Sequence, residues 1–254
     1  KKINLEGIVL KPRLNRVAFS NRYKNQQERY QFTFDSLVAN QIDFNKLLDD
    51  RTIKTSHINL INGALTVYLD RGKPQKNIDK GQNFPNLALK RINWNIIADT
   101  ISIKSTNINY TEFNPKTNQE GTFLLKNLSG RIYHVTNDLA ALKKNKYADA
   151  YFTTYVMDRG KLNCHLKFNL TDAKGSFLFD GDMGYMQTSS LNSLTRPLAK
   201  MATTSGIINS LAFKIKGDIN GAGGTLTLKY DNLKIAINQK IKKLDILANK
   251  AEGI

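Results

Sequence analysis

The sequence predicts a mainly β fold with a few short helices, and three features predict it. Asn, Thr and Ser are abundant, whereas only five of the 254 residues are Pro. Apolar and polar residues alternate along most of the chain, as in strands that are buried on one face. Helical spacing of apolar residues is confined to a few short stretches. A chain of this length accommodates one large β domain or two smaller ones.

The clearest strand is predicted at 161–171, KLNCHLKFNLT. Its odd-numbered residues are polar and its even-numbered ones are apolar, so the apolar side chains share one face. A turn at 173–175 and the sequence SFLFD at 176–180 predict a return strand and hence a hairpin. The same alternation predicts strands at 3–10, 16–22, 29–38, 54–61, 64–70, 97–104, 107–113, 121–127, 130–135, 148–157 and 207–217.

Helices are predicted at four places. Asp43 is a suitable N-cap for a helix at 43–48, and Thr136 or Asn137 for one at 138–145. A third helix, at 191–202, requires Pro197 to lie in its first turn, where proline is tolerated. The fourth, at 239–251, has a modest apolar stripe and ends before a glycine.

Two segments resemble each other. SHINLINGALTVYLD at 56–70 and DTISIKSTNINYTEF at 99–113 each predict a strand, a short turn and a second strand. Ile58, Leu60, Leu65 and Val67 match Ile101, Ile103, Ile108 and Tyr110. Internal duplication and the similarity of any two hairpins both account for this pattern.

The apolar alternation changes parity near the C-terminus, in GTLTLKYDNLKIAI at 224–237. Apolar residues occupy even positions up to Tyr230 and odd positions from Leu233. A one-residue shift moves every later side chain to the opposite face of a sheet. We therefore predict a β-bulge at 231–232, which returns Tyr230 and Leu233 to one face with a pairing irregularity between them.

The formal net charge is +17, which favours polyanionic partners such as anionic lipid headgroups or nucleic acid. Dispersed solubilising charge and a functional basic face both remain open. Cys164, the single cysteine, excludes an internal disulfide. The sequence contains neither an apolar run of membrane-spanning length nor a signal peptide, and its abrupt ends are typical of a piece of a larger protein.

No catalytic or metal-binding pattern is visible, so we expect neither an enzyme nor a cofactor. The three histidines occupy separate strands, and His165 must point away from its neighbour Cys164. Asp180-Gly181-Asp182 begins like a calcium loop but lacks the later carboxylates. Aromatic residues interleave with basic ones, as in sheets that stack nucleic-acid bases, but no RNP-like octapeptide occurs, and nucleic acid is not the expected partner.

Several stretches together resemble the periplasmic part of the AsmA-like proteins of Gram-negative bacteria, within the repeating-β-groove, bridge-like lipid transfer superfamily. LEGIVLKP at 5–12, IDFNKLL at 42–48 and LTVYLDRGKP at 65–74 resemble strand and helix segments of that family. So do INYTE at 108–112 followed by GTF at 121–123. The C-terminal match is the fullest: 177–182, Met186, LN at 191–192, GIINSL at 206–211 and 224–237 follow the family's order.

The resemblance covers nearly the whole chain, and it implies a long, twisted antiparallel sheet curved into an open groove. It implies a periplasmic protein that binds or conducts phospholipid between the inner and outer membranes and supports outer-membrane biogenesis. Its membrane anchor would be an N-terminal helix outside these 254 residues. The residues expected on the apolar groove face are Leu162, Cys164, Leu166, Phe168, Leu170, Phe177, Phe179, Leu226, Leu228, Tyr230, Leu233 and Ile235.

Three parts are predicted along the chain: an N-terminal β-groove part at 1–136 with the two similar segments, a C-terminal β part at 137–238, and a terminal helix or linker at 239–254. Two other functions remain open. A closed core of two sheets would indicate a scaffolding protein of the cell envelope. A basic nucleic-acid-binding module is the weaker alternative.

Overall fold

The computed structural model describes residues 1–75 and 84–237. The predicted helix at 239–251 therefore lies outside the described residues. The elements are β1 (Ile3–Leu10), α1 (Arg16–Arg22), β2 (Arg29–Asn40), α2 (Phe44–Asp49), β3 (Thr52–Asp70), α3 (Pro85–Lys90), β4 (Asn95–Asn114), β5 (Gln119–Thr136), α4 (Leu139–Lys144), β6 (Tyr147–Val156), β7 (Gly160–Asn169), β8 (Phe177–Met183), β9 (Met186–Gln187), a 3₁₀ turn η2 (Thr188–Leu191), α5 (Asn192–Ala199), β10 (Met201–Asp218) and β11 (Gly221–Ile237).

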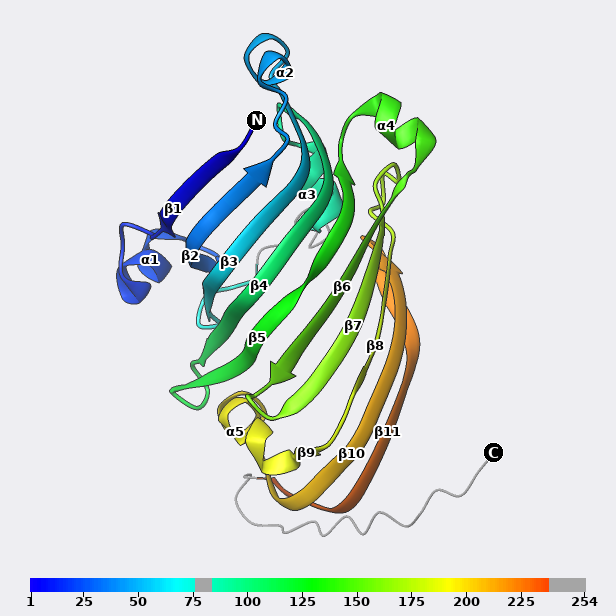
Figure 1. Ribbon diagram of the computed structural model, residues 1–254. Helices are drawn as coiled ribbons and strands as arrows, with labels where there is room; N and C mark the ends of the chain where they lie inside the picture. The colour runs from blue at the N-terminus through cyan, green and yellow to red at the C-terminus, as the bar shows by residue number, and fades with distance from the viewer. Residues whose placement is uncertain (76–83, 238–254) are drawn as a thin grey trace.

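The eleven strands form one sheet in the order β1-β2-β3-β4-β5-β6-β7-β8-β10-β11, with the short β9 beside β10. The sheet curls strongly but does not close into a barrel (Figure 1). The mainly β fold with a few short helices is thus confirmed. Pairing is antiparallel except between β3 and β4, which are parallel, so the sheet is mixed. The sheet also continues across 136/137, where β5 pairs with β6.

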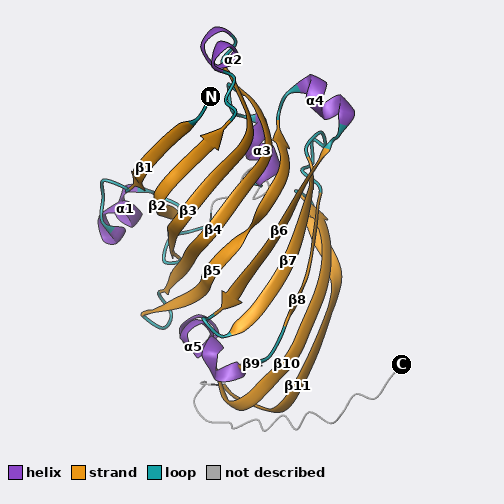
Figure 2. Cartoon of the chain, in the orientation of Figure 1, coloured by secondary structure: helices purple, strands orange, loops and turns teal. Residues whose placement is uncertain are grey.

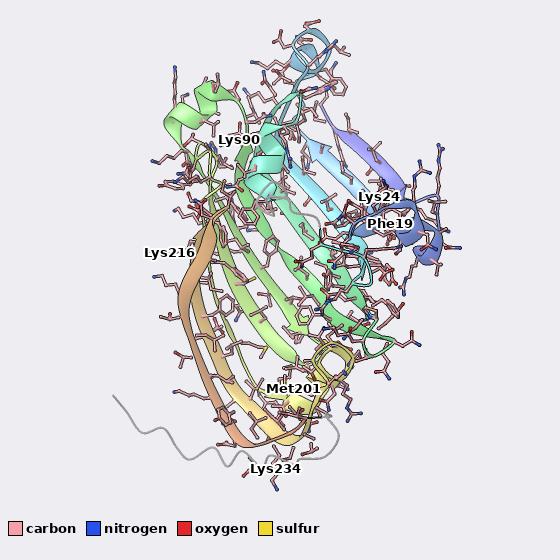
Figure 3. All side chains as sticks on the ribbon, turned by 180° about the vertical axis from the view of Figure 1, so that it is seen from behind. Phe19, Lys24, Lys90, Met201, Lys216 and Lys234 are labelled. Atoms are coloured by element: carbon pink, nitrogen blue, oxygen red, sulfur yellow. The ribbon has the colours of Figure 1, made fainter. Side chains whose placement is uncertain are left out.

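The helices lie at the ends of the strands (Figure 2). Helices α2, α3 and α4 lie at one end of the sheet, which we call the α3 end, and α1 and α5 lie at the other, the α5 end. Because β3 and β4 are parallel, the connection that contains α3 crosses back to the start of β4. Helix α3 lies behind the strands in Figure 1 and in front of them in Figure 3, on the concave face. Helix α5 also contacts this face, because Leu198 lies directly over Gly121 of β5.

Three predictions about individual elements are wrong. Residues 16–22 form α1 rather than a strand, because Asn15 caps the helix by accepting a hydrogen bond from Ala18 N at 2.9 Å. Pro197 lies well inside α5, not in its first turn. The predicted hairpins at 56–70 and 99–113 are the single long strands β3 and β4, and 121–127 and 130–135 together form β5.

The two similar segments are neighbours in the sheet. β3 and β4 pair in parallel, and the residues matched in sequence are cross-strand partners. These pairs are Ile58 with Ile101, Leu60 with Ile103, Leu65 with Ile108, and Val67 with Tyr110. Where a turn was expected, each strand continues through one residue with positive φ. These residues are Asn62, with a φ of 51°, and Ser105, with a φ of 52°.

Similar bulges recur at the same level of neighbouring strands. Gly7 in β1 (φ 62°) and Asn127 in β5 (φ 52°) continue the line through Asn62 and Ser105. We call these four residues the bulge line. At each of them the sequence parity changes but the apolar face does not. The register of β1 to β4 runs unchanged across this level, with Asp35 of β2 opposite Gly7 and Asn62, so these strands carry the added residue together. The pairing shifts where β5 meets β4 and β6.

The bulge predicted near the C-terminus is confirmed. Asn232 has a φ of 49°, and the pairing of β10 with β11 shifts between Ile207–Asp231 and Ser205–Lys234. Leu233 lies half-buried beside Gly206, whereas Asp231 and Asn232 are exposed. The bulge thus restores the apolar face after Tyr230.

Candidate functional site: the concave apolar face

Apolar residues follow one register row across the whole sheet. Direct cross-strand partners point to the same face. One such row comprises Ile3, Ala39, Ile58, Ile101, Ile132, Ala150, Leu166, Phe179, Ile215 and Gly224. With strands about 4.8 Å apart, its nine steps span roughly 43 Å along the curve. The row is therefore longer than the hydrocarbon core of a bilayer, which is about 30 Å thick.

A second row beside it contains two glycines. It runs through Ile103, Gly130, Phe152, Cys164, Gly181, Phe213 and Leu226. A Cβ atom on Gly130 or Gly181 would lie closer than 3.0 Å to the ring of its cross-strand partner, Phe152 or Phe213. Glycine here lets the aromatic ring lie against the sheet, so the ring becomes part of the concave lining.

The concave face holds a cavity of about 520 Å³ at the α3 end. This volume falls in the range typical of ligand pockets, about 300–1,000 Å³. The sheet contributes the wall on one side and α3 with its flanking residues the other. The lining residues are Pro85, Asn86, Ala88, Leu89, Ile92, Ile101, Ile132, Val135, Ala148, Ala150, Phe152, Leu166, Phe168 and Leu170.

Helix α3 bridges two parts of the sheet that are far apart in sequence. Asn86 Nδ2 donates to the carbonyl of Asn169 at 3.3 Å, and Lys90 Nζ donates to that of Asp172 at 2.6 Å. From the other side, Asn137 Nδ2 donates to the carbonyl of Leu89 at 3.3 Å. These bonds fix the position of the helix, and the small side chains of β6 leave space between it and the sheet.

Asn86 is the polar member of the cavity lining, and it is 2% exposed. Its Nδ2 is bonded to Asn169, but its Oδ1 is buried without a hydrogen-bond partner. An orphaned acceptor of this kind costs about 1–3 kcal/mol.

The α5 end of the same face is filled by side chains. Val156, Met183, Met186 and Ile208 form a buried cluster, and Met186 is 1% exposed. Residues from β5, β7, β10, η2 and the turn between β6 and β7 pack around it: Phe123, Leu125, Met157, Leu162, Leu191 and Leu211. Asn114 Nδ2, at the end of β4, ties α5 to the sheet by donating to the carbonyl of Pro197 at 2.9 Å.

The structure places the predicted site residues of β7 and β8 together on the concave face. Leu166, Phe168 and Leu170 line the cavity. Phe177 packs against Phe84 with a centroid distance of 5.4 Å and perpendicular rings, and Phe179 packs against Phe213 at 4.8 Å.

Leu162 and Cys164 lie on the same strand face but do not line the cavity. Leu162 packs against the cluster at the α5 end rather than in the cavity. Burial raises the pKa of the Cys164 thiol, which keeps it protonated and unreactive.

The predicted residues of β11 lie at the free edge of the sheet. Leu226 and Leu228 pair with Phe213 and Leu211 and so share the concave face, but Leu226 is 65% exposed. Tyr230 is exposed too, whereas Leu233 and Ile235 are half-buried. The sheet edge thus leaves part of the apolar face open to solvent.

Sequence reasoning missed α3 and the small residues of β6. Ala148 and Ala150 line the cavity, as do Ile101 and Ile132 from β4 and β5. Pro85 at the first position of α3 was an available signal, because proline is favoured there. Gly130, an interior strand glycine, was another.

The convex face carries one compact polar group, which was also missed. His165 Nε2 lies 2.9 Å from Asp149 Oδ1, and Nδ1 lies 3.2 Å from Asp180 Oδ2. Tyr151 stacks on the imidazole at 4.5 Å. Both ring nitrogens are therefore occupied, and the group links β6, β7 and β8.

Across residues 1–75 and 84–237, no cluster of three or more histidine, cysteine or acidic residues is arranged to hold a metal ion. Nor does any helix in these ranges combine the length and apolarity needed to cross a bilayer. Comparison of the sequence with protein-family models and with curated proteins finds no match.

Proposed function

We propose that the protein binds acyl lipid in its open β-groove and conducts it without chemical change. The observation that carries this proposal is the concave apolar face, which is continuous across the sheet and contains a cavity of about 520 Å³. Each methylene buried there contributes about 0.8 kcal/mol, so several methylenes suffice to hold a chain while the headgroup stays in water.

The sheet architecture favours lipid carriage over the scaffolding alternative. A scaffold of the expected kind requires two sheets packed face to face. The described residues form one sheet, and short helices contact its concave face at the two ends. From the resemblance to AsmA-like proteins, the proposal also includes a periplasmic location and phospholipid transfer between the two membranes. It includes a membrane anchor that lies outside this chain.

Mass spectrometry of organic extracts from the purified protein tests the proposal directly. We expect phospholipid or another acyl lipid in the extract, and uptake of a fluorescent phospholipid after delipidation. Absence of lipid from repeated extracts of folded protein, together with no uptake, would contradict the proposal.

A pair of tryptophan variants locates the bound lipid. Leu166→Trp projects into the cavity and should lower phospholipid uptake several-fold. Tyr151→Trp places the same side chain on the convex face, where Tyr151 is exposed, and should leave uptake unchanged. Equal uptake by both variants, with unchanged unfolding midpoints, would place the lipid elsewhere.

A further inference from the structure

The two ends of the sheet differ in charge. The described connections at the α5 end (11–28, 71–75, 115–118, 157–159 and 184–200) contain eleven basic and two acidic residues. Those at the α3 end (41–51, 84–94, 137–146, 170–176 and 219–220) contain eight basic and five acidic residues. The net charges are therefore +9 and +3, and the excess charge is concentrated at the α5 end.

The largest part of this difference comes from one segment, KPRLNRVAFSNRYKNQQ at 11–27, which we call the α1 segment. It contains five basic residues and no acidic one. Lys11, Arg13, Arg22 and Lys24 are exposed.

Exposed apolar side chains lie among these cations. Val17 is 69% exposed and Tyr23 is 39% exposed, while Phe19 and Ser20 face the protein. Val9 and Leu10, at the adjoining end of β1, are exposed as well. Segments that combine basic side chains with protruding aliphatic and aromatic ones suit the interface of an anionic bilayer.

The α1 segment is held firmly in place. Arg16 Nη1 lies 2.9 Å from Glu120 Oε2, and its guanidinium stacks over the ring of Tyr68 at 4.8 Å. Arg29 Nε donates to the carbonyl of Leu14 at 3.1 Å. The exposed side chains are thus presented from a fixed backbone, and binding requires little ordering of the chain.

We propose that the α1 segment docks the protein onto an anionic phospholipid bilayer. The cations lie at the headgroups, and Val17 and Tyr23 enter the boundary with the acyl chains. The exposed aliphatic residues favour a bilayer over nucleic acid, whose phosphate backbone gains nothing from them. This docking concerns a different surface from the groove and does not depend on lipid binding there.

Flotation of the full chain with vesicles tests the docking. We expect binding to vesicles containing 30 mol% phosphatidylglycerol in phosphatidylcholine, no binding to pure phosphatidylcholine, and weaker binding as salt is added. Each cation at an anionic surface is worth about a fivefold change in affinity. Arg22→Glu with Lys24→Glu should therefore reduce binding by more than about 25-fold, and Val17→Asp should also reduce it.

Lys143→Glu with Lys144→Glu makes the same charge change on α4, at the α3 end, and is the matched control. We expect it to change affinity less than about threefold. Equal losses from the two double variants would overturn the proposal, as would no binding to anionic vesicles. Tighter binding to a single-stranded oligonucleotide, lost in the α1 variant, would assign the surface to nucleic acid instead. Both pairs are exposed, and circular dichroism checks that both variants fold.

Discussion

The α3 and α5 ends of the concave face are formed by the same sheet, but one end contains a cavity and the other is filled by side chains. At the α5 end, Met183 and Met186 pack with Val156 and Ile208 in a buried cluster. At the α3 end, hydrogen bonds of Asn86 and Asn137 fix α3, and Ala148 and Ala150 leave a cavity between it and the sheet. Side-chain volume on β6, β8 and β9 thus decides whether the concave face forms core or cavity.

The largest difference between the ends should appear on truncation. Met186→Ala removes a fully buried side chain and should lower the free energy of unfolding by about 3 kcal/mol. Leu166→Ala, at the half-buried cavity wall, should cost about 1 kcal/mol, because much of that surface already faces space. Urea unfolding of both variants measures this difference. Equal losses would mean that the α3 end is packed as tightly as the α5 end.

Enlarging a side chain should produce a smaller difference in the free energy of unfolding between the two ends. Val156→Phe adds volume to the cluster at the α5 end and should destabilise the protein by about 1–3 kcal/mol. Ile132→Phe projects into the cavity, and we expect a change below about 1 kcal/mol. The unfolding midpoints of the two variants test this. A larger loss of stability for Ile132→Phe than for Val156→Phe would contradict the presence of free space at the α3 end.

The smallest difference concerns alkaline pH, where the ends should respond with opposite signs. At the α5 end, burial and the hydrogen bond from Tyr110 to Glu112 raise the pKa of Tyr110 above 10.0. The folded state then holds its proton longer than the unfolded state, so stability falls as the pH rises above 10. At the α3 end, burial lowers the pKa of Lys90 below 10.5, and stability rises as the pH approaches 10.5.

Urea unfolding between pH 8 and 11 measures both contributions. Tyr110→Phe should lose less stability than the wild type above pH 10, and Lys90→Gln should gain less on the way to pH 10.5. Identical pH profiles for the wild type and both variants would contradict the assigned shifts.

The alternation of apolar and polar residues in the sequence was sufficient to predict strands, their faces and one bulge. The hairpin of β7 and β8, the face shared by Leu166 and Phe179, and the bulge at Asn232 were all predicted correctly. Alternation failed at 16–22, where the side-chain cap at Asn15 outweighed the strand pattern. It also failed at Asn62 and Ser105, because a turn and a left-handed bulge both favour the same small polar residues.

The cavity could not be predicted, because it depends on contacts between distant parts of the chain. Asn86 bonds to a carbonyl 83 residues away, and the carbonyl of Leu89 accepts a hydrogen bond from Asn137, 48 residues away. The spacing of residues within α3 contains no information about either partner. Nor does the alternation of β6 reveal that its alanines face a helix that stands away from the sheet.

The bulge line has a consequence for how the protein is encoded. Gly7, Asn62, Ser105 and Asn127 are extra residues, since without them each strand would alternate regularly and still present the same apolar side chains to the same side. A chain lacking these four and Asp35, their neighbour in β2, would keep its lining but lose a source of local twist and bending. Shape and surface chemistry are thus specified by separate small sets of residues, and each can change by mutation while the other is preserved.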